Sequence, residues 1–283
     1  MRRFKTEKYG RANFHHSITP TPEAKMFERH CHSGYELIYV VQGEGKYIVE
    51  SAEYPLLPNT VLLLRPYEYH YVCPSESCNY ERYVIHFSEE MFIDATDRIS
   101  FVRPDSSQKS GIYFPSDTVS GTIRTQFELL DLSFFGNDVT DSDEPSRPET
   151  AFRIITNQIL LLLSYLKPDA PQKAENELVG RIMQYLNEHL AEEVSLEEMA
   201  RHFFVSKYHL CHTFRSYTGV SIFSYLGSKR IALAQQMLED GTPAVDAAYQ
   251  VGFGDYSVFY RAYRKLTGES PAKTKGRAKR GSK

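Results

Sequence analysis

The sequence predicts an α+β protein with two domains: an N-terminal β-barrel accompanied by two helices, then an all-helical C-terminal domain. Two observations carry this prediction. Short apolar runs separated by turn-forming residues occupy the first third of the chain, and after about residue 120 the apolar residues recur at helical spacing. A chain of 283 residues is also longer than the roughly 250 residues beyond which a single hydrophobic core seldom grows, so two domains are expected. Its 41% hydrophobic and 24% charged residues are ordinary for a globular domain.

The first domain, residues 1–115, is predicted to be a small antiparallel barrel or sandwich. Between Tyr35 and Phe87 the strand-like segments are YELIYVV, GKYIVE, TVLLLR and ERYVIHF. The segments QGEG, SAEYPLLPN and CPSESCN lie between them and are rich in turn-forming residues. Several short strands at close spacing are typical of both architectures.

Residues 116–167 are predicted to form two amphipathic helices. Their apolar stripes are Ile123, Phe127, Leu130 and Phe134, then Phe152, Ile155, Ile159, Leu162 and Leu166. Such stripes either cover the barrel or form a seam between two chains, and the spacing alone leaves both open. Residues 168–176, with Pro168 and Pro171, are predicted to be the interdomain linker.

The remaining residues, 177–283, are predicted to be helical. Ser195 with Glu198 has the spacing of a capping box, and Asp255 is placed as an N-cap. Helices are expected to end at Gly219, Gly241 and Gly268. Short helices joined by tight turns pack as small bundles.

The helical region contains a repeat at an offset of 49 residues, which places RSYTGVS (215–221) on RKLTGES (264–270). The predicted apolar faces are Leu210, Phe214 and Tyr217 in the first copy, and Phe259, Tyr263 and Leu266 in the second. The opposite faces are polar, aromatic or basic, which is typical of helix-turn-helix units whose second helix enters the DNA major groove. The connector from Ile222 to Glu239 would be about 27 Å long, comparable to the roughly 34 Å between successive major grooves. An ordinary helical bundle with an ancestral duplication is the alternative.

The charge distribution supports a nucleic-acid partner for the helical domain. The net charge is only −3, but residues 207–283 hold 13 Lys+Arg against 5 Asp+Glu, a net of +8. A cationic domain on an otherwise acidic chain favours a polyanion, and double-stranded DNA is preferred over a membrane because no amphipathic membrane helix accompanies the charge. The final segment KTKGRAKRGSK also fits a solvating basic tail.

No segment approaches the roughly 20 apolar residues needed to cross a bilayer. The N-terminal MRRFKTEKYGRANFHH lacks the apolar stretch of a secretion signal, so a cytoplasmic location is expected. The four cysteines, at positions 31, 73, 78 and 211, lack C-x2-C spacing and are expected to be reduced thiols.

The stretch RHCHSGYELIYVVQGEG places His30, His32 and Glu36 at H-x-H-x3-E spacing. On one strand, these even-numbered positions face the same side. Histidine with carboxylate suits a transition metal, a polar effector pocket or a structural network, and the spacing alone does not choose among the three.

The C-terminal sequence resembles the tandem helix-turn-helix domain of the AraC/XylS transcriptional regulators across roughly residues 178–275. The matching positions are Ala200, Ser206, Leu210, Arg230, Ile231, Ala234, Leu238, Gly252, Phe253, Gly268, Ser270 and Pro271. The resemblance implies DNA contacts from Lys207, Tyr208, Cys211, His212, Arg215, Tyr256, Ser257, Tyr260, Arg261 and Arg264. Cys211 is a weak donor, whereas Arg261 is suited to guanine, and Arg215 and Arg264 to phosphate.

HCHSGYELIYVVQGEG and NTVLLLRPYEYHYV resemble the cupin-type effector domain of the same family. The resemblance implies an effector pocket, for a carbohydrate by analogy with sugar-responsive members, with contacts from His30, His32, Glu36, Tyr39 and His70. Metal-binding cupins place equivalents of His30, His32, Glu36 and His70 around Fe, Mn, Ni or Zn, but here Asn59 and Tyr67 replace glycines of the second motif.

These observations favour a regulator without catalytic residues or cofactor. We expect a homodimer that binds DNA and an effector, and that contacts RNA polymerase if it activates transcription. The rival hypothesis is a metal-dependent cupin isomerase or oxygenase with an appended helical module.

Overall fold

In the computed structural model, the described residues are 3–9, 12–93, 111–119, 121–132, 146–171 and 176–278. They form two compact units, a β-rich unit and a helical unit. The first comprises Met1–Arg29 and Gly34–Lys173, and the second comprises Ala174–Lys283 together with the short segment His30–Ser33. Within the described residues, no helix is both long and apolar enough to cross a membrane.

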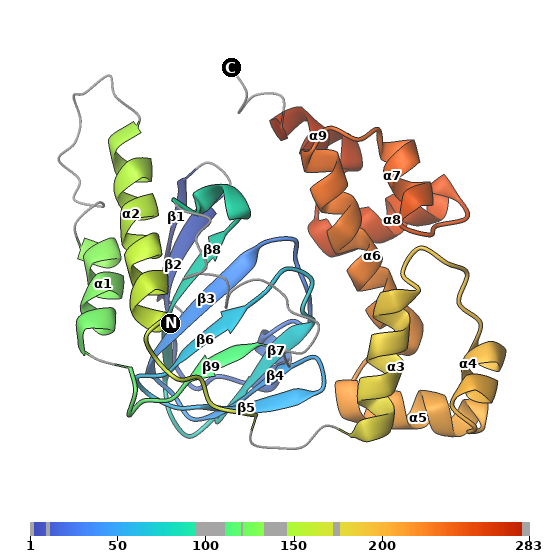
Figure 1. Ribbon diagram of the computed structural model, residues 1–283, viewed down its shortest axis with the longest axis horizontal. Helices are drawn as coiled ribbons and strands as arrows, with labels where there is room; N and C mark the ends of the chain where they lie inside the picture. The colour runs from blue at the N-terminus through green and yellow to red at the C-terminus, as the bar shows by residue number, and fades with distance from the viewer. Residues whose placement is uncertain are drawn as a thin grey trace. The chain divides into compact units, whose positions relative to one another are not determined.

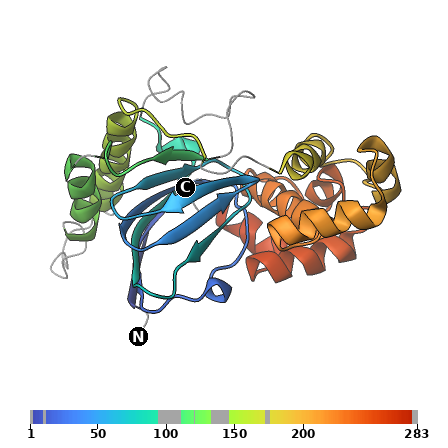
Figure 2. The same cartoon turned by 90° about the horizontal axis from the view of Figure 1, so that it is seen from below.

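The β-rich unit is a two-sheet antiparallel barrel (Figures 1 and 2). The larger sheet has the strand order β1-β2-β8-β3-β6-β9 and the smaller sheet the order β5-β4-β7. The strands are β1 (Arg3–Tyr9), β2 (Ala12–Thr19), β3 (Tyr35–Gln42), β4 (Gly45–Val49), β5 (Ala52–Leu56), β6 (Val61–Leu64), β7 (His70–Pro74), β8 (Tyr80–Phe87) and β9 (Ile112–Phe114), with short 3-10 turns η1 (Ala24–Met26) and η2 (Glu89–Met91). The predicted barrel is therefore present, with more strands than the sequence indicated.

Strand β5 corrects one prediction, because the sequence interpretation treated SAEYPLLPN as a turn. Pro55 made this segment look unlike a strand, since proline lacks a backbone donor. The structure places β5 at an edge of the small sheet, where Pro55 lies opposite Lys46 of β4. An edge strand tolerates proline, and the alternating burial of β5 then becomes apparent. His70–Pro74 likewise forms β7, paired with the other side of β4.

The large sheet has two different faces, because side chains alternate along each strand. Odd-numbered residues of β3 and β8, such as Leu37 and Ile85, pack with helices α1 (Gly121–Leu132) and α2 (Ser146–Leu163) in one core. Even-numbered residues, such as Ile38 and Val84, face the small sheet in a second core. The barrel interior is therefore the even-numbered side of β3 and β8.

The two amphipathic helices cover the odd-numbered face of the sheet (Figure 1). Ile123, Phe127 and Leu130 of α1 are buried there, as are Phe152, Ile155 and Ile159 of α2. Of the two alternatives that the periodicity left open, the buried stripe covers the barrel. Phe134 lies outside the described residues.

The helical unit contains the predicted repeat. Its helices are α3 (Glu177–Glu188), α4 (Leu196–His202), α5 (Lys207–Thr218), α6 (Ile222–Glu239), α7 (Ala244–Gln250), α8 (Tyr256–Thr267) and α9 (Pro271–Ala278). The N-caps of α4 and α8 are Ser195 and Asp255, whose side chains accept from backbone N–H groups three residues later. Gly219 and Gly268 follow α5 and α8 in the left-handed conformation, as expected for C-terminal caps.

The two helix-turn-helix units turn in the same way. After α4, Val205 N–H bonds the Ala200 carbonyl around Phe204, whose φ is 56°. After α7, Phe253 N–H bonds the Ala248 carbonyl around Gly252, whose φ is 90°. Both are six-to-one bonds of the Schellman type, which require a left-handed residue after the helix. The repeat in the sequence is therefore a repeat in backbone structure.

Helix α9 corrects the interpretation of Lys273–Lys283 as a solvating tail. Thr274 is only 2% exposed, and its hydroxyl lies 2.8 Å from the hydroxyl of Tyr263 in α8. Lys273 pairs with Glu269 on the exposed side. The first part of the basic segment therefore packs onto the helix-turn-helix unit.

Candidate functional site

Helix α5 presents most of its predicted DNA-binding residues to solvent. Its core side holds Leu210 and Phe214, both fully buried. The predicted contact residues lie on other faces: Lys207, Tyr208, His212 and Arg215 are exposed, and Cys211 is partly exposed. Tyr208 is 78% exposed and stacks on His212 with ring centroids 5.6 Å apart. An exposed, preformed aromatic pair beside basic groups suits contact with base edges and phosphates.

Lys207 differs from its neighbours because it already has an acidic partner. Its ammonium donates a hydrogen bond to the carboxylate of Glu197 in α4, and this bond lowers the pKa of Glu197. The ion pair is solvent-exposed and therefore weak. A DNA phosphate would compete with Glu197 for Lys207.

Helix α8, like α5, has a buried side that packs in the core and an exposed side that carries predicted contact residues. Phe259 and Tyr263 are fully buried, whereas the predicted contact residues Ser257, Arg261 and Arg264 are exposed. Tyr256 and Tyr260 are half-buried, and Tyr256 packs against the core. Leu266 was predicted to lie in the core but is 50% exposed, because the buried face ends at Tyr263.

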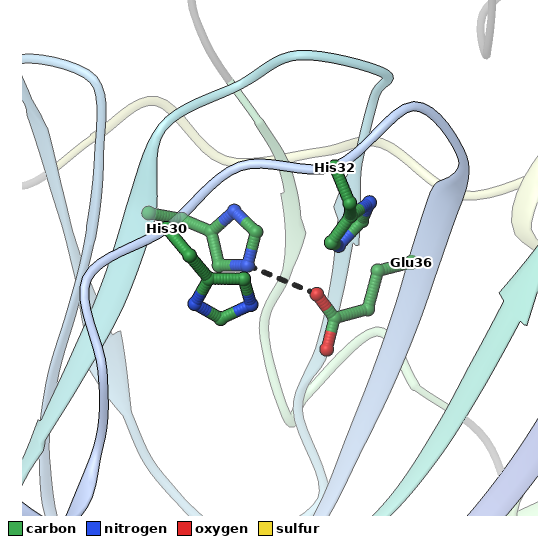
Figure 3. Close-up of side chains that lie close together, drawn as sticks. His30, His32 and Glu36 are labelled. Carbon is green, nitrogen blue, oxygen red and sulfur yellow. Dashed lines mark ion pairs between the residues drawn. The ribbon is translucent and has the colours of Figure 1, made fainter. Parts of the chain in front are cut away.

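The structure brings together four of the five predicted effector-binding residues. Ligand-type atoms of His30, His32, Glu36 and His70 all lie within 4.8 Å of one another. Figure 3 shows the rings of His30 and His32 beside the Glu36 carboxylate. The Glu36 carboxylate also forms an ion pair with His70. Glu36 and His70 are buried, His32 is partly exposed and His30 is exposed. We call these four residues the histidine–glutamate cluster.

The buried part of this cluster has a defined orientation. His70 Nδ1 lies 2.8 Å from the carbonyl oxygen of Glu68, which can only accept, so Nδ1 carries the proton. His70 Nε2 then faces Glu36 Oε2 at 3.1 Å. Burial lowers the pKa of His70, but the hydrogen bond and the negative charge of Glu36 outweigh burial and raise the pKa above its ordinary value. The position beside Glu36 therefore favours positive charge.

His86, which the sequence analysis did not single out, adjoins the same carboxylate. Its Nε2 lies 3.5 Å from Glu36 Oε1, and its Nδ1 lies 2.8 Å from Asn13 Oδ1. In the β3–β8 register, His86 is directly opposite Glu36. The alternation in YERYVIHF could have indicated this side, once the pairing with β3 was known.

Tyr39, the fifth predicted effector-binding residue, lies on the opposite face of the sheet. It is 1% exposed, and its ring stacks on Phe127 of α1 at 5.1 Å. Its hydroxyl donates to Asn59 Oδ1 at 2.8 Å. Because odd positions of β3 face the helices, the structure does not bring Tyr39 to the histidine–glutamate cluster.

Arg82 is a second interior residue that the sequence analysis missed. Its guanidinium lies over the ring of Tyr80 at 4.4 Å and near Phe27 at 5.4 Å, on the even-numbered side of β8. Its Nη1 is buried and has no hydrogen-bond partner among the described residues. A buried arginine donor without a partner is costly, and a polar ligand would satisfy it.

Asn59 and Tyr67 stand where the family motif has glycines, and both have a left-handed backbone conformation. Their φ angles are +60° and +66°, in the left-handed region that glycine adopts most easily. Asparagine tolerates this conformation better than tyrosine does.

A separate cavity of about 400 Å³ opens elsewhere in the β-rich unit. It is bordered by β9, the end of α2 and residues 168–171, and its lining is mostly apolar. None of the histidine–glutamate cluster lines it. The polar chemistry and this cavity are thus at different places in the unit.

Two helix-turn-helix units joined to a barrel of this kind define a DNA-binding transcriptional regulator with a ligand-binding domain. An AraC-like ligand binding domain matches residues 18–131, and a helix-turn-helix domain matches residues 199–277. The chain belongs to the AraC/XylS family of transcriptional regulators. The family consists of regulators, not enzymes, so the metalloenzyme hypothesis was wrong.

Curated relatives agree with this assignment. The chain is 24% identical over 259 residues to the HTH-type transcriptional activator RhaS of Salmonella schwarzengrund (strain CVM19633), covering 90% of each chain. It is 23% identical over 233 residues to the uncharacterized HTH-type transcriptional regulator YbfI of Bacillus subtilis (strain 168), covering 82% of this chain and 81% of YbfI.

Two solved structures are similar to this chain. ToxT from Vibrio cholerae O395 is 12% identical, with 94% of this chain and 98% of that chain covered and a TM-score of 0.40. The C-terminal domain of AraT, a response regulator from Geobacillus stearothermophilus, is 27% identical, with 35% and 83% covered and a TM-score of 0.34. The family assignment rests on the domain matches and the curated relatives.

Proposed function

We propose that this regulator reads a specific operator through α5 and α8, under control of a carbohydrate effector bound inside the barrel. The observation that carries the DNA-reading part is the pair of exposed, partly basic helix faces on two equivalent helix-turn-helix units. Arg261 is the candidate for bidentate contact with guanine, while Arg215 and Arg264, nearer the helix C-termini, are candidates for phosphate contacts. Tyr208 and His212 are candidates for apolar and single-hydrogen-bond contacts.

Two features of the barrel interior support a polyhydroxylated effector. Arg82 offers a buried donor, and Tyr80 and Phe27 lie beside it as apolar ring surfaces. Sugars are bound by such combinations, because hydroxyl groups need directed partners while the apolar side of the sugar packs on rings. The histidine–glutamate cluster adds further polar groups on the interior side.

The experiment that tests this function measures DNA binding and effector binding in the same preparation. A mobility shift on DNA from upstream of the regulator's own gene should give a sequence-specific complex with steep salt dependence. A thermal-shift screen of sugars should find one that raises the melting temperature, because it binds only the folded state. Arg82→Gln should reduce that shift and leave DNA binding without sugar intact. Absence of any specific complex, with or without sugar, would overturn the DNA-reading proposal.

We further propose a homodimer formed through α2. The buried stripe of this helix faces the sheet, but Ile154, Leu161 and Tyr165, in and just after α2, are 51%, 40% and 70% exposed. Their spacing of seven and then four residues forms a second apolar stripe on one helix face. Leu129 of α1 is also partly exposed. A second copy of the chain would cover the stripe on α2.

Replacing Leu161 with glutamate should shift the protein from dimer toward monomer, because a charge in an apolar seam is costly to bury. Light scattering over a dilution series would measure the dissociation constant, and we expect an increase of at least about tenfold, or 1.4 kcal/mol. Gln250→Glu, at an exposed position of α7 outside this stripe, is the matched control. Equal dissociation constants for Leu161→Glu and the parent would exclude this seam.

The regulator is proposed to act in the cytoplasm, where its operator is accessible. If it activates transcription, RNA polymerase is a further proposed partner.

A further inference from the structure

We propose that Arg230 is a positioning residue that fixes the separation of α5 and α8, and therefore the spacing between the two half-sites of the operator. A half-site is the DNA segment that one of these helices reads. This inference rests on the proposed reading of DNA by α5 and α8, and it adds what sets the distance between them. It depends on contacts that Arg230 makes with both helix-turn-helix units.

Helix α6 is shared by the two units (Figure 1). In its first half, the ring of Tyr225 packs edge-on against Phe214 of α5, with centroids 5.6 Å apart, and its hydroxyl lies 3.4 Å from Asn187 Oδ1 of α3. The second half is buried in one core with residues of α7 and α8 through Ile231, Ala234 and Leu238. The stretch of α6 between these halves therefore decides how one unit is held relative to the other.

This middle stretch contains a glycine, Gly227. Glycine in a helix interior is less stable than alanine, because its backbone has more freedom to lose. Among the described residues, no atom outside the backbone of α6 lies within 4 Å of the place where a Cβ would stand, so packing does not require glycine here. Helix α6 is therefore easiest to bend between its two halves, and a contact outside the helix has to fix the geometry.

The side chain of Arg230 provides that contact. Its Nε donates to the carbonyl oxygen of Leu190 at 2.7 Å, and its Nη2 donates to the carbonyl oxygen of Glu192 at 2.5 Å, both in the loop between α3 and α4. The guanidinium also lies 5.8 Å from the ring of Phe253, in the turn between α7 and α8. Because a guanidinium donates in a rigid planar fork, two such bonds fix its orientation as well as its position. Arg230 thus contacts both units at once.

The backbones of the two units also meet beside this arginine, at Gly252 in the turn between α7 and α8. A Cβ on Gly252 would stand 2.8 Å from Arg230 Nη2 and 2.9 Å from the carbonyl carbon and oxygen of Ala191. The turn of the second unit therefore lies against the same loop of the first unit that Arg230 holds. We call this contact, formed by residues 190–192, Arg230 and residues 252–253, the α6 clamp.

A fixed separation has a consequence for the operator. One turn of B-DNA spans about 34 Å and about 10 base pairs, so one added base pair moves a half-site by about 3.4 Å and rotates it by about 35°. Two rigidly held helices cannot follow that change. Helices joined by a bent α6 can follow it, at the cost of affinity for the original spacing.

The first test compares the full-length parent with Arg230→Ala on the operator, on operators with one base pair inserted or removed between the half-sites, and on DNA with one half-site scrambled. We expect the ratio of affinities between the original and altered spacings to fall at least about tenfold, because two charge-assisted hydrogen bonds are lost. Affinity for DNA with one intact half-site should not change. A general loss of folding or charge would lower that affinity as well.

Three further variants separate the clamp from charge. Arg230→Lys keeps the charge but lacks the fork, so it should lose spacing preference as Arg230→Ala does. Adding Gly227→Ala to Arg230→Ala stiffens α6 and should restore part of the preference. The matched control is Arg181→Ala, which removes an exposed arginine of α3 whose ring contact, with Phe203, lies within the first unit, and it should keep the spacing preference of the parent.

A second test needs no DNA. Spin labels are placed on α5 and α8 through Ser216→Cys and Lys265→Cys, both at exposed positions, after the four native cysteines are replaced by serine. We expect one narrow distance distribution with Arg230 present and a broader or shifted one in Arg230→Ala, with circular dichroism confirming that each chain is folded. An Arg230→Ala chain with the distance distribution or the spacing preference of the parent would overturn the clamp. A parent without any specific operator complex contradicts the proposed function instead, and the label distances still test the clamp.

Discussion

Replacing Arg261 with alanine is expected to weaken binding to the specific operator by about 1 to 3 kcal/mol and to relax the preference at one base pair. Arg261 is exposed on α8, one helical turn before Arg264, and its neighbours Phe259 and Tyr263 hold the helix in the core. The change therefore removes a base-reading side chain without removing packing. Fluorescence anisotropy with the operator and with single-base variants measures both effects.

Arg264→Ala is the matched control, because it removes the same charge from the same helix. We propose that Arg264 contacts a phosphate, so its loss should weaken binding to all DNA sequences about equally. The number of counterions released on binding, which sets the salt dependence of the affinity, should fall by about one. If Arg261→Ala and the parent bind the operator with equal affinity, the proposal that α8 contacts bases through Arg261 is contradicted. Identical behaviour of the two variants would show that α8 contacts DNA through charge alone.

Replacing Phe127 with alanine is expected to lower the free energy of unfolding of the β-rich unit by about 3 to 5 kcal/mol. Phe127 is fully buried between α1 and the sheet, with its ring 5.1 Å from that of Tyr39 and 6.1 Å from that of Tyr83. Its removal would leave a cavity and break an aromatic stack that joins the helix to the barrel. Urea denaturation followed by circular dichroism measures the loss.

Leu129→Ala, on the same helix, provides the comparison. Leu129 is 37% exposed, so its replacement should cost much less than that of Phe127. If Phe127→Ala unfolds at the same urea concentration as the parent, α1 does not contribute its packing to the stability of the barrel.

Repeated patterns allowed much of the fold to be predicted from the sequence. The connector was predicted from Ile222 to Glu239, and α6 has these bounds. The capping roles of Asp255 and Gly268 were also confirmed, because capping depends on a few neighbouring residues. Helical spacing, caps and the 49-residue repeat are all local signals, and they are strongest where helices are short and well capped.

The strands were harder to predict, because their stability depends on partners distant in sequence. Pro55 concealed β5, whose place at a sheet edge is decided by pairing with β4. Tyr39 has the residue type of an effector contact, but the alternation of β3 places it against Phe127 instead. Which side of β3 is interior depends on the positions of the small sheet and of α1, not on β3 alone.

By itself the sequence determined the two-part organisation, the paired helix-turn-helix units and the spacing of His30, His32 and Glu36. The resemblance to the family's barrel also predicted that His70 joins them. Only the tertiary structure decided that Tyr39 faces α1, that His86 lies beside Glu36 and that Arg82 lies inside the barrel. The physical reason is that helices are specified by contacts three and four residues apart, whereas these side chains are brought together by pairing between strands far apart in the chain.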